Sequence, residues 1–321
     1  MRVFLTSPWI PVEWIRAHGL EPRGIWCDDE FWNTSVPLTA GACAFAEKAV
    51  RFAESQTDSA VIFTSSCDQL RRGYDTATFH GQPRAFLFNI PATQSPAAKQ
   101  IYHCEVERLG LLLLQLGGRA PDFETLRQEM RQASRSRNRL IDSAAGGSPR
   151  DFAEAVAQFQ WNGGSVAVPP ALPEKRVPLA IVGGPMAAPH WPLLDNIEAA
   201  GGSIVLNATE IGERSLSPAF ALDVADANLL DTLVDGYFDN IIDVFQRPNA
   251  ALYSWLRPRL ASRRVRGILL WHFTGCDLWR AETQTLREAF GLPVLLLEAG
   301  ERPEVAARDV NRLQAFVESL Q

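Results

Sequence analysis

The five cysteines are the residues of this sequence with the most chemistry to offer, and two of them share a local pattern. The pattern [ST]-x-Cys-Asp-x-x-Arg occurs once around Cys67 and once around Cys276, each time after an apolar run typical of a buried parallel strand. Near the start of the helix that follows, the helix dipole favours a thiolate, and thiolates bind soft metals. The repeat therefore predicts metal ligands or nucleophiles, the alternative being that both cysteines pack as small apolar residues.

The other three cysteines divide into one candidate and two structural residues. Cys43 follows Gly41, which allows close backbone approach, and it lies at the start of residues 42–52, which read as a helix. It is therefore either a third member of the site or a core residue. Cys27, at the end of a predicted strand, and Cys104, inside a predicted helix, are expected to be structural. The absence of a CxxC pair argues against a zinc knuckle, and the odd, widely spaced set argues against a disulfide scaffold.

Eight short runs rich in Val, Ile, Leu and Phe predict the strands that would position these cysteines. The runs lack the alternation of a half-exposed strand, which is typical of parallel strands covered on both faces. The spacers between them are long enough for crossover helices, so the chain predicts an α/β fold with two doubly wound parallel sheets. The expected strands are residues 2–6, 23–27, 60–64 and 84–89, then 178–182, 203–206, 266–271 and 293–298.

The two groups of strands also resemble each other, which indicates a degenerate internal duplication. The first strand of one group is followed by Thr6-Ser7-Pro8 and that of the other by Gly183-Gly184-Pro185. Helices are expected at 97–116, 122–143 and 149–160, between the two groups. The predicted organisation is a first α/β domain at 1–96 with Cys43 and Cys67, a helical segment at 97–168, a Pro-rich linker at 169–177, and a second α/β domain at 178–321 with Cys276.

Composition narrows the function classes. The formal charge is −6, from 31 basic and 37 acidic residues, so the chain has no general attraction to nucleic acid or to an anionic membrane surface. The longest apolar stretch, residues 109–116, is far shorter than the ~20 residues of a membrane span. The apolar run at the N-terminus leads into a proline without a cleavage site and is interpreted as a first strand rather than a signal peptide. We therefore expect a cytoplasmic protein.

Two further groups of polar residues have open interpretations. Arg127, Arg131 and Arg135 are spaced as one stripe of a helix, which is either a clamp for the phosphates of a ligand or a solvated face or subunit contact. Residues 209–214, which contain Glu210, Glu213 and Arg214, read as a loop rich in groups that could meet a substrate, and Glu213 and Arg214 are the pair with a second interpretation. They either meet a substrate or pair with each other at the surface.

Motifs spread over most of the chain together resemble one known family. They are Thr6-Ser7-Pro8 with Pro11-Val12-Glu13-Trp14, residues 64–72 around Cys67, Leu87-Phe88-Asn89-Ile90-Pro91, Val182-Gly183-Gly184-Pro185, Cys276-Asp277 with Glu282, and residues 312–318. In this order and spacing they resemble the 2-hydroxyacyl-CoA dehydratases, whose relatives include the benzoyl-CoA reductase subunits. The resemblance implies two flavodoxin-like domains with a [4Fe-4S] cluster between them. The positions that match its three cysteine ligands are Cys43, Cys67 and Cys276, which leaves the fourth iron without a cysteine.

The same resemblance implies an activity and a set of partners. A separate ATP-hydrolysing iron-sulfur activator supplies one electron, and the acyl-CoA thioester is converted to a ketyl radical; the chain itself has no Walker A motif. Dehydratases of the family are lyases that expel a hydroxyl, whereas the reductase branch consists of oxidoreductases. The expected partner is a paralogous subunit in a heterodimer, or a second copy in a homodimer. Alternatively, the chain is a non-catalytic scaffold or electron-relay subunit.

Three residues beside the cysteines are candidates to support such a cluster. Ser66, Asp68 and Asp277 lie next to Cys67 or Cys276 in the repeated pattern. Side chains at such positions can orient the ligands or donate hydrogen bonds to their sulfurs. The sequence identifies no proton-transfer residue.

Overall fold

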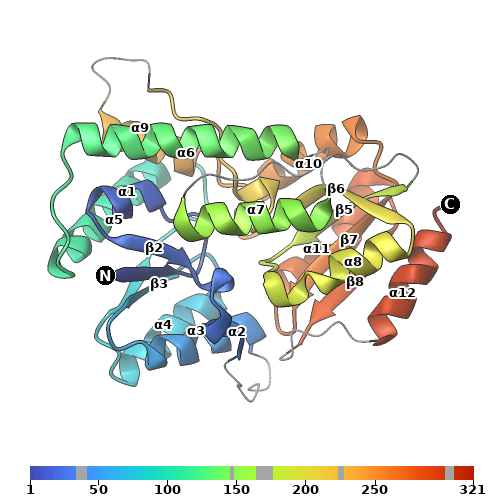
Figure 1. Cartoon of the computed structure of the whole chain (residues 1–321), viewed down its shortest axis with the longest axis horizontal. Helices are drawn as coiled ribbons and strands as arrows, with labels where there is room; N and C mark the ends of the chain where they lie inside the picture. Colours follow the sequence, from blue (N-terminus) through green and yellow to red (C-terminus); the bar gives the residue numbers. More distant parts are fainter. Residues whose placement is uncertain (34–41, 145–147, 164–175, 223–227, 301–306) are drawn as a thin grey trace.

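The computed structural model describes residues 1–33, 42–144, 148–163, 176–222, 228–300 and 307–321. It contains two four-stranded sheets with the same topology, in the orders β2-β1-β3-β4 and β6-β5-β7-β8. Neighbouring strands in both sheets are parallel. The two sheets lie in the left and right halves of Figure 1, with helices packed around each of them. The predicted α/β fold with two tandem flavodoxin-like sheets is therefore confirmed.

The strands agree closely with the apolar runs. In the first sheet they are β1 (Arg2–Leu5), β2 (Glu21–Gly24), β3 (Ala60–Thr64) and β4 (Ala85–Phe88). In the second sheet they are β5 (Val177–Gly183), β6 (Gly202–Thr209), β7 (Gly267–Phe273) and β8 (Val294–Ala299). Strands β3 and β7 are buried along their whole length, as expected for central strands of a parallel sheet.

The helices cover both faces of the sheets and the region between them. Those before β5 are α1 (Val12–Ala17), α2 (Asp29–Asn33), α3 (Ala44–Ser55), α4 (Asp68–Phe79), α5 (Pro96–Gln115), α6 (Phe123–Ser143) and α7 (Pro149–Asn162). Those after it are α8 (Pro192–Ala199), α9 (Leu229–Phe238), α10 (Ala250–Ser262), α11 (Asp277–Phe290) and α12 (Ala307–Glu318). Short 3₁₀ turns lie at η1 (Ile25–Cys27), η2 (Ala188–His190) and η3 (Glu213–Ser215).

The prediction of the second strand was wrong by two to three residues. Residues 23–27 were expected, but β2 begins at Glu21 and ends at Gly24, and Cys27 belongs to the 3₁₀ turn that follows. Because β2 is an edge strand, Pro22 needs no partner for the amide hydrogen that it lacks. The turn after Gly24 carries Ile25 and its neighbour into the core, and a continued strand would not do so.

The domain boundaries remain a prediction, and part of the predicted linker lies outside the described residues. Of residues 169–177, only the last two are described, and Val177 already belongs to β5. The glycine pair at 146–147 also lies outside them.

Helix α7 contacts β2 of the first sheet and β6 of the second, and Figure 1 shows it between the two halves. The helical segment therefore packs against both sheets.

An apolar core joins the two halves of the protein. Phe273, at the end of β7, stacks on Trp32 with ring centroids 6.0 Å apart and contacts Phe45 of α3 at 5.6 Å. His190 of η2 packs edge-on against Trp32 at 4.7 Å. The rings of Trp32, Phe45 and Phe273 belong to one buried cluster, which also contains strand residues of both sheets. The apolar contact fixes the carboxyl edge of one sheet against that of the other.

A buried ion pair and a tyrosine link three helices, α1, α6 and α9. In α6, Nη2 of Arg137 donates a hydrogen bond to Oε1 of Glu13 in α1 at 2.6 Å. The hydroxyl of Tyr237 in α9 donates to the other oxygen of Glu13 at 2.7 Å. The side chains of Arg137 and Glu13 are 3% and 0% exposed. Such a buried charge is tolerated only while its partner is present.

We expect Arg137→Met to lower the free energy of unfolding by about 3–5 kcal/mol, because it leaves the Glu13 carboxylate buried without a counter-charge. Urea denaturation followed by tryptophan fluorescence measures the change. The double variant Arg137→Met with Glu13→Gln should recover a large part of the loss. Equal stability of Arg137→Met and the unmodified chain would show that the pair contributes nothing.

Candidate functional site

The three cysteines singled out by the sequence line one cavity in the structure. Cys43, Cys67 and Cys276 come together at a cavity of about 70 Å³. Cys67 follows β3 and Cys276 follows β7, so the cavity lies where the carboxyl edges of the two sheets meet. Open α/β sheets bind their ligands at this edge. The other lining residues are Thr6, Phe45, Ala46, Ser66, Leu70, Gly184, Pro185, Glu210, Asp243, Val244, Phe273, Leu278 and Trp279.

Each of these cysteines is the N-cap of a helix that points its amino end toward the cavity. Cys43 precedes α3, Cys67 precedes α4, and Cys276 precedes α11, helices of 12, 12 and 14 residues. The amino end of a helix carries a partial positive charge and free amide hydrogens. The amide of Leu70 donates one of them to Sγ of Cys67 at 3.3 Å. Three helix dipoles therefore favour negative charge at one place.

Burial opposes that charge when the sulfurs carry no metal. It is the largest cause of a raised pKa for all three thiols, and it raises the pKa of Cys67 to about 12. Backbone amides of the following helices lower the pKa of each thiol, but by less. The thiols also affect one another, because the nearby sulfur of Cys43 raises the pKa of both Cys67 and Cys276. A metal removes this penalty by taking the place of the protons.

The loop that carries Cys276 touches the loop that carries Cys43, backbone to backbone. Gly275 has a φ of +81°, and a Cβ there would lie 3.0 Å from Cα of Cys43 and closer still to the carbonyl of Ala42. The amide of Ala44 donates a hydrogen bond to the carbonyl of Thr274 at 3.1 Å. Only a glycine combines this conformation with this approach.

The three residues predicted to support the cysteines, Ser66, Asp68 and Asp277, lie in different surroundings. Ser66 lines the cavity, and its hydroxyl forms a hydrogen bond of 2.8 Å with that of Thr64. Asp68 points to solvent, with a side chain 91% exposed, and pairs with Arg71 at 3.1 Å. Asp277 is exposed in the first turn of α11. Neither aspartate lines the cavity, so their role beside the cysteines remains a prediction without a supporting contact.

Three further polar side chains line the cavity, those of Thr6, Glu210 and Asp243, and of these only Glu210 stood in a stretch that was expected to meet a substrate. The hydroxyl of Thr6, after β1, is buried without a hydrogen-bond partner. Glu210 follows β6 at the carboxyl edge of the second sheet. The pKa of Glu210 is raised to about 8, mainly by burial and to a smaller extent by the nearby Asp243, while Arg214 opposes the shift. The signal for Glu210 was its place after a strand, but the predicted strand ended three residues early.

The surface pair predicted for Glu213 and Arg214 is wrong, because both side chains are buried and each pairs elsewhere. Glu213 accepts hydrogen bonds from Arg263 of α10 at 2.5 and 2.7 Å. Arg214 is fully buried and pairs with Asp243. It also donates to the main-chain carbonyls of Ala208, Ile242 and Gly183. These bonds hold the ends of β5 and β6 next to the cavity.

Arg127, Arg131 and Arg135 lie at helical spacing on α6, but only the last two line the same surface hollow. Arg131 and Arg135 line an open surface hollow of about 440 Å³ together with Arg139. Arg127 instead lies over the ring of Phe123 at 4.7 Å. The hollow could bind phosphates, but the clamp remains a prediction.

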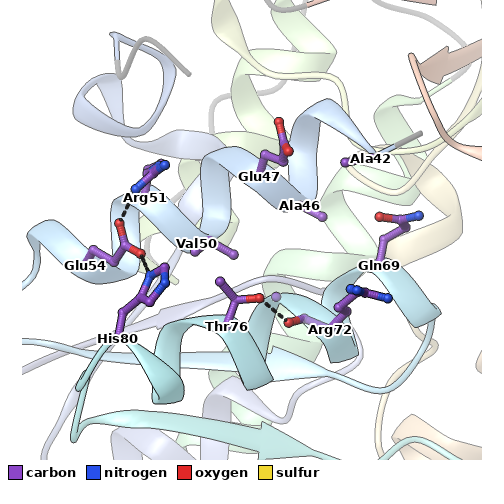
Figure 2. Close-up of a pocket in the computed structure, with 11 residues that line it drawn as sticks. Ala42, Ala46, Glu47, Val50, Arg51, Glu54, Gln69, Arg72, Thr76 and His80 are labelled. Atoms are coloured by element: carbon purple, nitrogen blue, oxygen red, sulfur yellow. Dashed lines mark hydrogen bonds and ion pairs between the residues drawn. The ribbon is translucent and has the colours of Figure 1, made fainter. Parts of the chain in front are cut away.

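A groove between α3 and α4 begins beside the cysteine cavity (Figure 2). Its volume is about 260 Å³, and Ala46 lines both the groove and the cavity. At this end, Oε1 of Gln69 accepts a hydrogen bond from the amide of Cys43 at 3.4 Å. At the far end, Glu54 pairs with Arg51 at 3.0 Å and with His80 at 2.6 Å. The groove therefore leads from a charged end toward the cysteines.

The donor set fits a metal cluster better than a single ion. Among the described residues, no group of three or more His, Cys, Asp or Glu side chains is arranged to hold one metal ion. In an iron-sulfur cluster each thiolate binds a different iron, so the sulfurs need not converge on one point. Three cysteines, an apolar wall and an unpartnered hydroxyl at Thr6 suit such a group.

Fold and site together define a class: proteins with two flavodoxin-like sheets whose facing edges enclose a cysteine-lined cavity. The family model for the 2-hydroxyglutaryl-CoA dehydratase D-component matches residues 9–320. The chain therefore belongs to this family, which is named for a dehydratase and so for a lyase-type enzyme. A comparison with curated proteins gave no match. In the described part of the chain, no helix has the length and apolar character needed to cross a bilayer.

We expect Gly275→Ala to destabilise the protein more than Gly81→Ala does. The two glycines have nearly equal φ angles, +81° and +86°, but a Cβ at Gly81 meets nothing within 4 Å. The control therefore measures the conformational cost alone, about 1–3 kcal/mol. The excess loss for Gly275→Ala, read from urea denaturation, reports the contact with Cys43. Equal losses would contradict the backbone contact.

Proposed function

We propose that this chain is the [4Fe-4S] subunit of a 2-hydroxyacyl-CoA dehydratase-like enzyme that acts reductively on a CoA thioester. Cys43, Cys67 and Cys276 are the cluster ligands, and the electron comes from a separate ATP-hydrolysing iron-sulfur activator. The observation that supports this most strongly is that Cys43 and Cys67 meet Cys276, which lies more than 200 residues further along the sequence, at one buried cavity. When bound, such a cluster supplies a single electron of very low potential to the thioester, which starts radical chemistry.

The residues of the chain would contribute in three ways. The amino ends of α3, α4 and α11 offset the negative charge of the ligated sulfurs. Amide hydrogen bonds, such as the one from Leu70 to Cys67, tune the reduction potential of a cluster. Apolar side chains such as Phe45 and Trp279 exclude water from the cavity. A dry site is needed because water would quench a strongly reducing centre and its radical product.

The family assignment also supports a subunit arrangement. A D-component implies at least one other component, so we propose a paralogous subunit as partner, with a second copy of this chain as the alternative. The substrate would be a 2-hydroxyacyl thioester, which loses water to give an unsaturated thioester. An aromatic thioester, reduced in its ring, would place the chain in the benzoyl-CoA reductase branch. Product analysis with the activator and the partner present separates the two.

We expect protein purified or reconstituted without oxygen to hold about four irons and four sulfides per chain, with a brown charge-transfer absorption. Replacing Cys43, Cys67 or Cys276 by Ala should abolish most of this iron and the colour. Iron and sulfide analysis together with an absorption spectrum measures both.

Cys104→Ala and Cys27→Ala serve as matched controls for these variants. Cys104 is exposed on α5, and Sγ of Cys27 donates to the carbonyl of Ala157 at 3.4 Å, away from the cavity. Both controls should keep iron and colour. Full colour in any of the three site variants, or colourless wild-type protein, would contradict the proposal.

A further inference from the structure

Glu210 brings an uncompensated carboxylate to the cysteine cavity. It lines the cavity together with Cys43, Cys67 and Cys276. No lysine, arginine or histidine is among the residues that line the cavity, and Arg214 acts on Glu210 only through its charge. An isolated carboxylate in apolar surroundings is costly unless a cation or a proton neutralises it. Glu210 is therefore neutralised at this position either by a proton or by a bound cation, and a metal that binds takes the place of the proton.

The nearby arginine does not provide this cation. Arg214 is fully buried and gives its hydrogen bonds to Asp243 and to three main-chain carbonyls. Its charge is therefore matched by Asp243, which also lines the cavity. Glu210 is the carboxylate in excess of this pair. An ionised Glu210 therefore leaves one negative charge unmatched on the cavity side.

From this arrangement we infer that Glu210 is the fourth protein ligand, with its carboxylate bound to the iron that has no cysteine. This inference rests on the proposed cluster. It replaces a water or hydroxide on that iron with a carboxylate oxygen and changes no oxidation state. Carboxylates are hard anionic ligands and bind iron readily in other proteins. The donor set is then three cysteines and one glutamate, drawn from both halves of the chain.

The ligand has a consequence for the role of the subunit. A carboxylate on the fourth iron occupies the position at which a substrate oxygen would bind. The cluster of this chain then passes electrons onward, while the dehydration takes place on the partner subunit. Glu210 thus favours the electron-relay role over direct catalysis by this chain.

The test uses the full chain, reconstituted without oxygen, with Glu210→Gln as the variant and Glu105→Gln as the control. Glu105 is a half-buried carboxylate of α5 that pairs with Arg108, away from the cavity. The dithionite-reduced proteins are measured by pulsed electron paramagnetic resonance in water labelled with a magnetic oxygen isotope. Wild type and Glu105→Gln should show no coupling to labelled water at the cluster, whereas Glu210→Gln should show it.

A second measurement follows the loss of the fourth iron. Ferricyanide accepts one electron from the cluster, and the iron without a cysteine leaves as Fe²⁺ to give a [3Fe-4S] product. Without its carboxylate that iron should leave about tenfold faster in Glu210→Gln, while Glu105→Gln should match the wild type.

The outcomes separate the inference from the proposed function. Coupling of labelled water to the cluster in the wild type overturns the glutamate ligand while the cluster stands, and this result needs no stable variant. Equal rates of iron loss overturn it as well. Wild-type protein that takes up no iron overturns both the proposed function and this inference.

Discussion

The site depends on one backbone contact, in which Gly275 lies against the chain at Ala42 and Cys43. The hydrogen bond from the amide of Ala44 to the carbonyl of Thr274 holds this contact, and the rings of Trp32, Phe45 and Phe273 pack beside it. Since the contact joins the two halves of the chain, it determines how far Cys276 lies from the other cysteines. A side chain at position 275 would separate the halves where their cysteines meet.

The electrostatics of the cavity are balanced between two opposing effects. Burial favours the neutral thiols, whereas the amino ends of three helices favour thiolates. Neither effect alone yields a stable buried charge, so the arrangement suits a ligand that brings positive charge of its own. By contrast, Arg137 of α6 and Glu13 of α1 form a buried ion pair, in which each side chain neutralises the charge of the other. Buried charges are thus matched by side chains of the protein at this pair, whereas the cysteine cavity leaves that role to a ligand.

Most of the fold could be predicted from the sequence, because the buried strands are continuous apolar runs and the Cys-Asp pattern repeats after β3 and β7. The meeting of Cys67 and Cys276 follows from that repeat, since equivalent strands end at equivalent edges. Other features depend on contacts between distant segments. Glu213 pairs with Arg263 and Arg214 pairs with Asp243, and both partners lie far along the chain. The sequence around Glu213 and Arg214 therefore does not show that their side chains are buried. The strand β6 also continues through polar Asn207 and Thr209, beyond the apolar run that predicted it, so Glu210 lies directly at the end of a strand and not within a loop.

The order of the cysteines along the chain affects how the protein can mature. Cys43 and Cys67 leave the ribosome long before Cys276, which follows the third strand of the second sheet. Any inorganic group that needs all three sulfurs must therefore wait until β7 is synthesised and inserted between β5 and β8. Loading is then a late event, after translation of both halves. A nascent chain that ends before β7 would contain Cys43 and Cys67 but would still lack the third sulfur that the group needs.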